Sequence, residues 1–267
     1  MPLTTIDSLQ NPRIKRVKGL SQKRNRDKEG QFLLEGEREL ERGLAAGLEA
    51  TQIMLCQEFF KHGEVSEALH QQLLQSSTPV VYLAKQVFEH CSYREHPDGF
   101  LAVCNTFQKT LDTLELSSTP LLLVLESLEK PGNLGTILRT ADAAGVDALI
   151  LNDPVTDLFN PNVIRTSAGV VFKVPTVVAT APETLDYLNS SNIHSYATTP
   201  ATDCLHYDAS FTGPSAIVMG SEKDGLTDFW IQNCTQKIRL PMHGQADSLN
   251  VGAATAAVLY EVIRQRR

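Results

Sequence analysis

Several features that would place this 267-residue chain in a protein class at once are missing. It has five cysteines, widely spaced and without a CxxC pair, so we expect reduced thiols and no zinc site. No apolar run approaches the roughly 20 residues that span a bilayer, and the start of the chain contains no apolar stretch of a secretory signal. We therefore expect a cytoplasmic protein with no bound metal and no membrane partner.

The commonest nucleotide-binding and hydrolase motifs are missing as well. No GxGxxG segment opens the first βα unit, and neither GxxxxGK[ST] nor GxSxG occurs. Their absence disfavours a dinucleotide-binding enzyme, a P-loop enzyme and a serine hydrolase. A functional site must therefore be sought in other polar segments.

Charge is unevenly distributed along the chain, whose net charge is −7. The first 30 residues carry eight basic and three acidic side chains, a local charge of +5, so the remainder carries −12. A basic segment on an acidic protein is typical either of nucleic-acid contact or of a solvated helix face, and the charges alone leave both open. Because this segment has no aromatic residues, RNA contacts there would be with phosphates, and the candidates are Arg13, Lys15, Arg16, Lys23 and Arg24.

Alternating apolar runs and amphipathic segments predict two α/β domains. We expect a first domain at 1–107, a linker rich in Thr and Ser at 108–119, and a second domain at 120–267. In the first domain the patterns predict strands at 31–34, 52–56, 79–83 and 99–104 and helices at 37–46 and 66–74. In the second they predict strands at 121–125, 148–151, 176–178, 193–197, 216–219 and 237–240 and helices at 133–144, 162–168, 183–188, 227–233 and from about 249. Short apolar strands between helices indicate a parallel sheet covered on both faces.

Three polar loops that contain glycine follow apolar strands of the second domain. They are 130–135, 220–226 and 240–251. In open α/β sheets ligands bind beyond the carboxyl ends of the strands, and glycine lets the backbone approach a ligand closely. We therefore expect these three loops to form one ligand site.

The same loops resemble the motifs of a known family. Asn133-Leu134-Gly135-x-x-x-Arg139-x-Ala141 resembles the first motif of the SpoU (TrmH-type) RNA ribose 2′-O-methyltransferases of the SPOUT superfamily. Gly220-x-Glu222-x-x-Gly225-Leu226 resembles the second motif, and Pro241-Met242-x-Gly244-x-x-x-Ser248-Leu249-Asn250-Val251 resembles the third. Nearer the start, Asn11-Pro12-x-Ile14-Lys15 and Phe32-Leu33-Leu34-Glu35-Gly36 are similar to the RNA-substrate-binding domain often fused in front of this catalytic domain.

This resemblance implies a fold, a cofactor and an assembly. It implies a SPOUT domain with a parallel sheet and a carboxyl-terminal segment threaded into a deep trefoil knot, preceded by a small ribosomal-protein-like α/β domain. It also implies a homodimer formed through the carboxyl-terminal domain, and S-adenosylmethionine held mainly by backbone groups of the motif loops. The cofactor-binding residues implied are Met219, Gly220, Leu240, Met242, Gly244 and Leu249.

The resemblance further implies which residues surround the target ribose: Asn133, Arg139, Glu222, Ser248 and Asn250. The methyl donor is already a strong electrophile, so the enzyme must align the 2′-oxygen and help remove its proton; alignment contributes at best about 7–11 kcal/mol. Arg139 is the family's candidate base, yet an arginine stays protonated in proteins, which suits it better to hold a phosphate or a developing alkoxide. Each of three of these residues could instead have a purely structural role. Asn133 could be the N-cap of a helix, Arg139 could form a surface ion pair, and Glu222 could be a solvated carboxylate.

We therefore predict transfer of a methyl group from S-adenosylmethionine to a ribose 2′-hydroxyl of structured RNA, with ribosomal RNA as the expected substrate. Transfer RNA is the alternative substrate, because only the fused amino-terminal domain favours ribosomal RNA. Two further alternatives stay open: a non-catalytic RNA-binding or ribosome-assembly factor on the same fold, and methylation of a base nitrogen.

Overall fold

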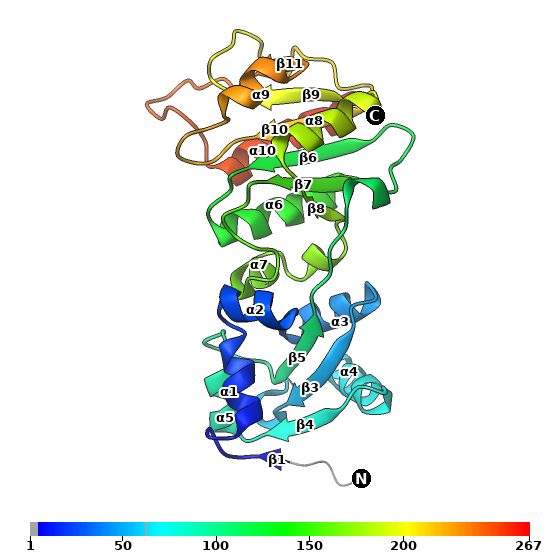
Figure 1. Ribbon diagram of the computed structural model, residues 1–267, viewed down its shortest axis with the longest axis vertical. Helices are drawn as coiled ribbons and strands as arrows, with labels where there is room; N and C mark the ends of the chain where they lie inside the picture. Colours follow the sequence, from blue (N-terminus) through cyan, green and yellow to red (C-terminus); the bar gives the residue numbers. More distant parts are fainter. Residues whose placement is uncertain (1–4, 62) are drawn as a thin grey trace. The chain divides into compact units, whose positions relative to one another are not determined.

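The computed structural model describes residues 5–61 and 63–267, which form two compact units (Figure 1). Unit 1 comprises the chain up to Phe107 together with Leu158–Lys173. Unit 2 comprises Gln108–Asp157 and Val174–Arg267. The segment 158–173, which the sequence pattern placed in the second domain, therefore packs with unit 1. Among the described residues, no helix is long and apolar enough to cross a membrane.

Unit 1 is built on a mixed five-stranded sheet in the order β1-β4-β3-β5-β2. Strands β1, β4 and β3 are parallel, whereas β5 is antiparallel to both of its neighbours. The strands are β1 (Thr5–Ile6), β2 (Gln31–Glu35), β3 (Ala50–Leu55), β4 (Val80–Leu83) and β5 (Phe100–Asn105). The helices are α1 (Pro12–Gly19), α2 (Lys23–Glu29), α3 (Glu37–Ala45), α4 (Glu64–Gln75), α5 (Lys85–Cys91) and α7 (Pro161–Thr166), with the 3-10 turns η1 (Gln57–Phe59) and η3 (Val170–Phe172).

The four strands and two helices predicted for the first domain are confirmed within a few residues. The helix α1 begins where the side chain of Asn11 accepts a hydrogen bond from the backbone N–H of Arg13 at 2.9 Å. Its apolar residues Ile14 and Val17 are fully buried in the core cluster that also contains Phe88 of α5. The basic segment is thus a folded part of unit 1, with most of its charged side chains exposed on two helices and Arg26 buried.

The segment 158–173 is held to unit 1 by aromatic packing. The ring of Phe32 on β2 is fully buried, and its centroid lies 4.6 Å from that of Phe159 and 5.9 Å from that of Phe172. The guanidinium of Arg42 on α3 also donates a hydrogen bond to the carbonyl of Ala168 at 2.7 Å. These contacts place α7 and η3 against the sheet of unit 1.

Unit 2 contains a six-stranded sheet in the order β11-β9-β10-β6-β7-β8, in which every pair of neighbours is parallel. The strands are β6 (Leu121–Glu126), β7 (Ala148–Asn152), β8 (Thr176–Val178), β9 (His194–Thr198), β10 (Ser215–Met219) and β11 (Gln236–Ile238). The helices are α6 (Pro131–Ala144), α8 (Ala181–Ser190), α9 (Asp228–Asn233) and α10 (Val251–Gln265), with the 3-10 turn η2 (Leu111–Thr113). The predicted parallel sheet and its six strands are confirmed.

Every residue of β6, β7 and β10 is buried, as expected for strands covered on both faces. One face packs into a core with α8 and α9, which includes Leu188 and the fully buried Trp230. Helix α10 packs against α6 and β10. The approach of the two helices is close, because a Cβ on Gly252 would lie 3.5 Å from the side chain of Thr136.

Two expectations about boundaries differ from the structure. Helix α6 begins at Pro131 with Lys130 as its N-cap, so the expectation that Asn133 starts and caps this helix is wrong. Proline suits the first helical position because its missing N–H would have no partner there. Residues 108–119, expected as a linker, pack within unit 2: the backbone N–H of Ser117 donates to Asp147 at 2.8 Å, and Leu111 lies against the core.

Candidate active site

The three sequence loops meet at the carboxyl ends of the strands of unit 2. Two of them, with the start of α10, line a cavity of about 580 Å³ next to the ends of β9, β10 and β11. A volume of this size suits a cofactor or another small molecule. The sequence-predicted residues that line the cavity are Met219, Gly220, Glu222, Leu240, Met242, Ser248 and Leu249.

The loop after β10 is closed on itself. Ser221 and Gly225 exchange backbone hydrogen bonds of 3.0 and 3.2 Å, and Gly225 adopts a φ of +71°, which favours glycine. A Cβ on Gly220 would lie closer than 3.0 Å to backbone atoms of Gly225 and Leu226. Glycine at 220 therefore lets the loop fold back tightly, and this fixes the position of Glu222.

Glu222 is joined to the other two loops by hydrogen bonds. The amide of Asn133 donates to Oε1 of Glu222, and the amide of Asn250 donates to Oδ1 of Asn133 at 3.3 Å. Oδ1 of Asn250 also accepts from the backbone N–H of Gly252 at 2.9 Å, so this residue is the N-cap of α10 as well. One polar residue from each motif thus takes part in a single network.

One atom of this network has no partner. Oε2 of Glu222 is buried and accepts no hydrogen bond from the residues that the structure describes. A buried carboxylate oxygen without a partner is unfavourable, and it becomes favourable when a ligand supplies a donor. The position therefore suits a hydroxyl or an N–H group of a bound molecule.

The loop between β11 and α10 offers free backbone groups. Its residues 240–249 make no hydrogen bond with any other described part of the chain. The side chain of Leu249 is 45% exposed, and Leu240 and Val251 supply further apolar surface to the cavity. Unpaired backbone N–H and C=O groups next to apolar side chains can bind a flat polar heterocycle such as a nucleobase.

Four predicted residues are not among those lining the cavity. Asn133 and Asn250 are connected to it through their hydrogen-bonded network with Glu222, whereas Arg139 and Gly244 are not. Arg139 is exposed on α6, and within the described chain its guanidinium forms no hydrogen bond or ion pair. Gly244 is exposed in the loop and is not among the residues lining the cavity. The surface ion pair that the sequence allowed for Arg139 is therefore not present among these residues.

Several residues of this region belong to none of the three sequence motifs. Thr198, Thr199 and Pro200 line the cavity from the end of β9, which carries no glycine motif. Glu126, at the end of β6, is buried and accepts hydrogen bonds from the backbone N–H and the hydroxyl of Thr227 at 2.8 and 2.7 Å. Glu126 therefore holds the end of the loop after β10 in place. Its position as the single carboxylate at the end of an apolar strand is the feature of the sequence that could have indicated this role.

The predicted RNA-binding residues lie on α1 and α2 of unit 1. Arg13, Lys15 and Arg24 are exposed. Arg16 forms an ion pair with Glu29 at 2.6 Å, and Lys23 forms one with Asp27 at 2.7 Å. In residues 5–61 and 63–267 no group of three or more His, Cys, Asp or Glu side chains could hold a metal ion.

Comparison with known proteins gives matches over both parts of the chain. The sequence pattern described as the SpoU rRNA Methylase family matches residues 120–260. The pattern described as the MRM3-like substrate binding domain matches residues 11–102. Together these matches cover most of the sequence.

Individual relatives match over nearly their full length. The 23S rRNA guanosine 2′-O-methyltransferase RlmP of Bacillus subtilis is 29% identical, over 96% of this chain and 98% of that protein. A crystal structure of an RNA 2′-O ribose methyltransferase has a TM-score of 0.86 and 38% identity, covering 98% of this chain and 99% of the other. The AdoMet-bound rRNA methyltransferase from Sinorhizobium meliloti has a TM-score of 0.89 and 26% identity, covering 98% of both chains.

Proposed function

The chain belongs to the SpoU rRNA methylase family, and on this premise we propose that it methylates a ribose 2′-oxygen of ribosomal RNA. Its activity is that of an RNA 2′-O-ribose methyltransferase, and its methyl donor is S-adenosylmethionine. Large-subunit ribosomal RNA is the proposed substrate, since 23S rRNA is the substrate in the name of a relative that matches both units. The single observation that carries the site assignment is the network joining Asn133, Glu222 and Asn250 at the edge of one cavity.

The cavity of unit 2 fits this methyl donor. Its volume is that of a cofactor site, and Met219, Leu240 and Leu249 give it apolar surface for an adenine ring. The unpaired backbone groups of 240–249 can accept and donate hydrogen bonds to the adenine edge and ribose hydroxyls. When bound there, the donor supplies an electrophilic methyl group on its sulfonium.

The polar residues then orient the target ribose. Glu222 accepts a hydrogen bond from the RNA through its free Oε2, while Asn133 holds the carboxylate in place through Oε1. Ser248 lies on the cavity wall and presents a hydroxyl to the same region. Arg139, exposed and without an internal partner in the described chain, contacts an RNA phosphate with its guanidinium.

The finer architecture belongs to the same proposal. Unit 1 binds the RNA substrate, and unit 2 is a SPOUT catalytic domain whose carboxyl-terminal segment is threaded into a trefoil knot. Packing of α10 against both α6 and β10 supports the threading. Exposure of Tyr260 on α10 (54%), together with that of Leu249, supports a homodimer formed through this helix. A ribosomal substrate would place the protein in the cytoplasm.

Methyl transfer from labelled S-adenosylmethionine to purified rRNA and tRNA tests the proposal directly. We expect label in rRNA only, recovered after nuclease digestion as a 2′-O-methylated nucleoside. Glu222→Gln should lower the turnover number while cofactor binding, measured by calorimetry, persists. Label in tRNA, label on a base nitrogen, or cofactor binding without transfer to either RNA would instead support the corresponding alternative.

A further inference from the structure

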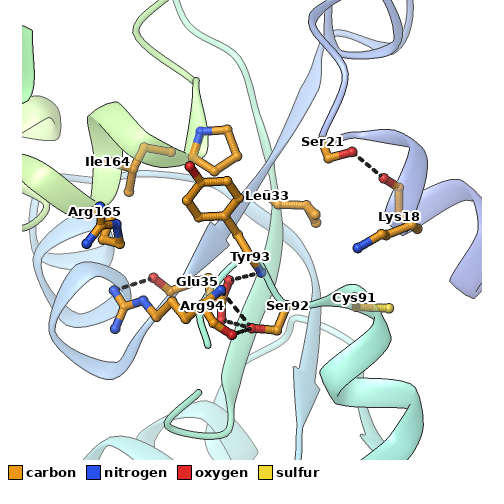
Figure 2. A pocket seen from close by; sticks show the side chains of 11 residues that line it. Lys18, Ser21, Leu33, Glu35, Cys91, Ser92, Tyr93, Arg94, Ile164 and Arg165 are labelled. Carbon is orange, nitrogen blue, oxygen red and sulfur yellow. Dashed lines mark hydrogen bonds between the residues drawn. The ribbon is translucent and has the colours of Figure 1, made fainter. Parts of the chain in front are cut away.

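Two adjoining hollows of unit 1 share three residues that the catalytic site does not use. The smaller hollow, of about 40 Å³, is lined from α1, β2, the 91–94 turn and α7, and the larger one, of about 610 Å³, from α3, the 93–96 turn and α7. Tyr93, Arg94 and Arg165 line both of them. Figure 2 shows the ring of Tyr93 beside Ile164 and Arg165 of α7. Tyr93 and Arg165 therefore stand at the boundary of two neighbouring hollows.

Tyr93 is an exposed aromatic residue on a rigid support. Its side chain is 53% exposed, whereas its backbone N–H donates to Oε2 of the buried Glu35 at 2.7 Å. Ser92 donates to the other oxygen of Glu35 (Figure 2). Burial raises the pKa of Glu35, and these two hydrogen bonds act against that rise. A buried carboxylate thus holds the main chain at the point where the ring emerges.

The next residue in the turn is fixed by buried charges. Arg94 forms ion pairs with Glu39 at 2.6 Å and with Asp98 at 3.3 Å, and both carboxylates are buried. It also donates to the carbonyl of Glu35 at 3.0 Å. A Cβ on Gly36, whose φ is +114°, would overlap the Arg94 guanidinium, so glycine at 36 leaves space for this side chain. The turn that carries Tyr93 is therefore preorganised.

Two cationic side chains that line the hollows with Tyr93 have no acidic partner among the described residues. Arg165 is exposed, and its guanidinium donates to the neutral amide oxygen of Asn162 at 2.8 Å, so its charge stays uncompensated there. Lys18 lines the smaller hollow, and its ammonium has no hydrogen-bond or ion-pair partner among the described residues. Arg38 lines the larger hollow with its side chain 58% exposed, where it pairs with Glu39 at 3.2 Å, and the acidic Glu95 lines this hollow as well. An exposed ring in the same hollow as two unpaired cations, Arg165 and Lys18, suits the two parts of a nucleotide, a flat base and an anionic phosphate.

We infer that this surface binds an unpaired nucleotide of the RNA substrate, with its base stacked on Tyr93 and its phosphates held by Arg165 and Lys18. The inference rests on the proposed function in one respect, that the substrate is RNA. An unpaired nucleotide is favoured over duplex RNA because only an unstacked base exposes its face to a side-chain ring. The larger hollow leaves room for the neighbouring nucleotide beside Arg38.

Binding of the full-length protein to two fluorescein-labelled RNAs tests this inference. One is a single strand of about 12 nucleotides, and the other is a blunt-ended duplex stem that has no loop and no unpaired base. Tyr93→Ala should weaken single-strand binding about 5- to 150-fold and leave stem binding unchanged, whereas Tyr93→Phe should stay within about twofold of wild type. Arg165→Gln should reduce the slope of log affinity against log salt by about 0.7.

Tyr207→Ala and Lys61→Gln serve as matched controls, because both residues are exposed and line neither hollow. In methyl-transfer assays Tyr93→Ala should raise KM for RNA with kcat unchanged. Equal single-strand binding by Tyr93→Ala and Tyr207→Ala would overturn the inference, as would a wild-type protein that binds no single strand. If Tyr93→Ala abolishes binding but wild type methylates no RNA, the binding site stands and the proposed function fails.

Discussion

Substitution of Gly220 by alanine is the sharpest test of the loop after β10. The added methyl group would lie closer than 3.0 Å to backbone atoms of Gly225 and Leu226, whereas ordinary contacts begin at 3.4 Å. Backbone atoms cannot rotate away as a flexible side chain can, so the Ser221–Gly225 hydrogen bonds must open. Overpacking costs about 1–3 kcal/mol, and we expect the upper end. At about 2–4 °C per kcal/mol, the midpoint of thermal unfolding should fall by about 6–12 °C.

The same substitution should impair the cofactor site, because Gly220 lines the cavity and its loop carries Glu222. We expect the dissociation constant for S-adenosylmethionine, measured by isothermal calorimetry, to rise at least about tenfold. Gly213→Ala is the matched control, since a Cβ at 213 meets no atom within 4 Å. If the two variants unfold at the same temperature and bind the cofactor equally, glycine at position 220 is not required for the tight closure of the loop.

Three further predictions concern unit 1 and the thiols. Phe32→Ala should lower the free energy of unfolding by about 3–5 kcal/mol in urea titration, because it removes a fully buried ring that packs on the segment with α7 and η3; a decrease below about 1 kcal/mol contradicts that packing. The double substitution Lys15→Gln and Arg24→Gln should reduce the slope of log RNA affinity against log salt concentration by about 0.7–0.9 for each phosphate that is no longer neutralised. An unchanged slope would show that neither residue contacts the RNA. Burial raises the pKa of Cys104 to about 12, and it also raises the pKa of Cys234, but Cys234 is only half-buried; at pH 8 iodoacetamide should therefore modify Cys234 before Cys104, as read by mass spectrometry, and equal rates would contradict the burial of Cys104.

Much of the fold of unit 2 could be predicted, because its strands and loops have the residue patterns typical of a parallel sheet. The strands β6, β7 and β10 are continuous apolar runs, and the structure buries every one of their residues. Strands β6 and β10 are each followed by a polar segment with glycine, and the helix after β6 ends at Gly145. Parallel strands bring their carboxyl ends to one edge, so loops distant in sequence were expected to meet there.

The placement of the segment 158–173 could not be predicted from its pattern. Its apolar residues, such as Phe159 and Val163, would suit the core of either unit. The choice is made by a partner distant in sequence, Phe32, whose ring lies 4.6 Å from that of Phe159. Arg165 is part of this segment, so its position beside Tyr93 could not be predicted from the sequence either.

The site residues divide into those fixed by folding and those left free for ligands. Asn133, Glu222 and Asn250 are hydrogen-bonded together by the chain itself, so a ligand that meets them need not order them. Residues 240–249 have no hydrogen bonds to the rest of the described chain, and a bound molecule must supply the partners of their backbone groups. It follows that changes to the network should act mainly on the alignment of the RNA. Changes in the loop should act mainly on affinity for the methyl donor, and the two classes should separate as effects on kcat and on cofactor binding.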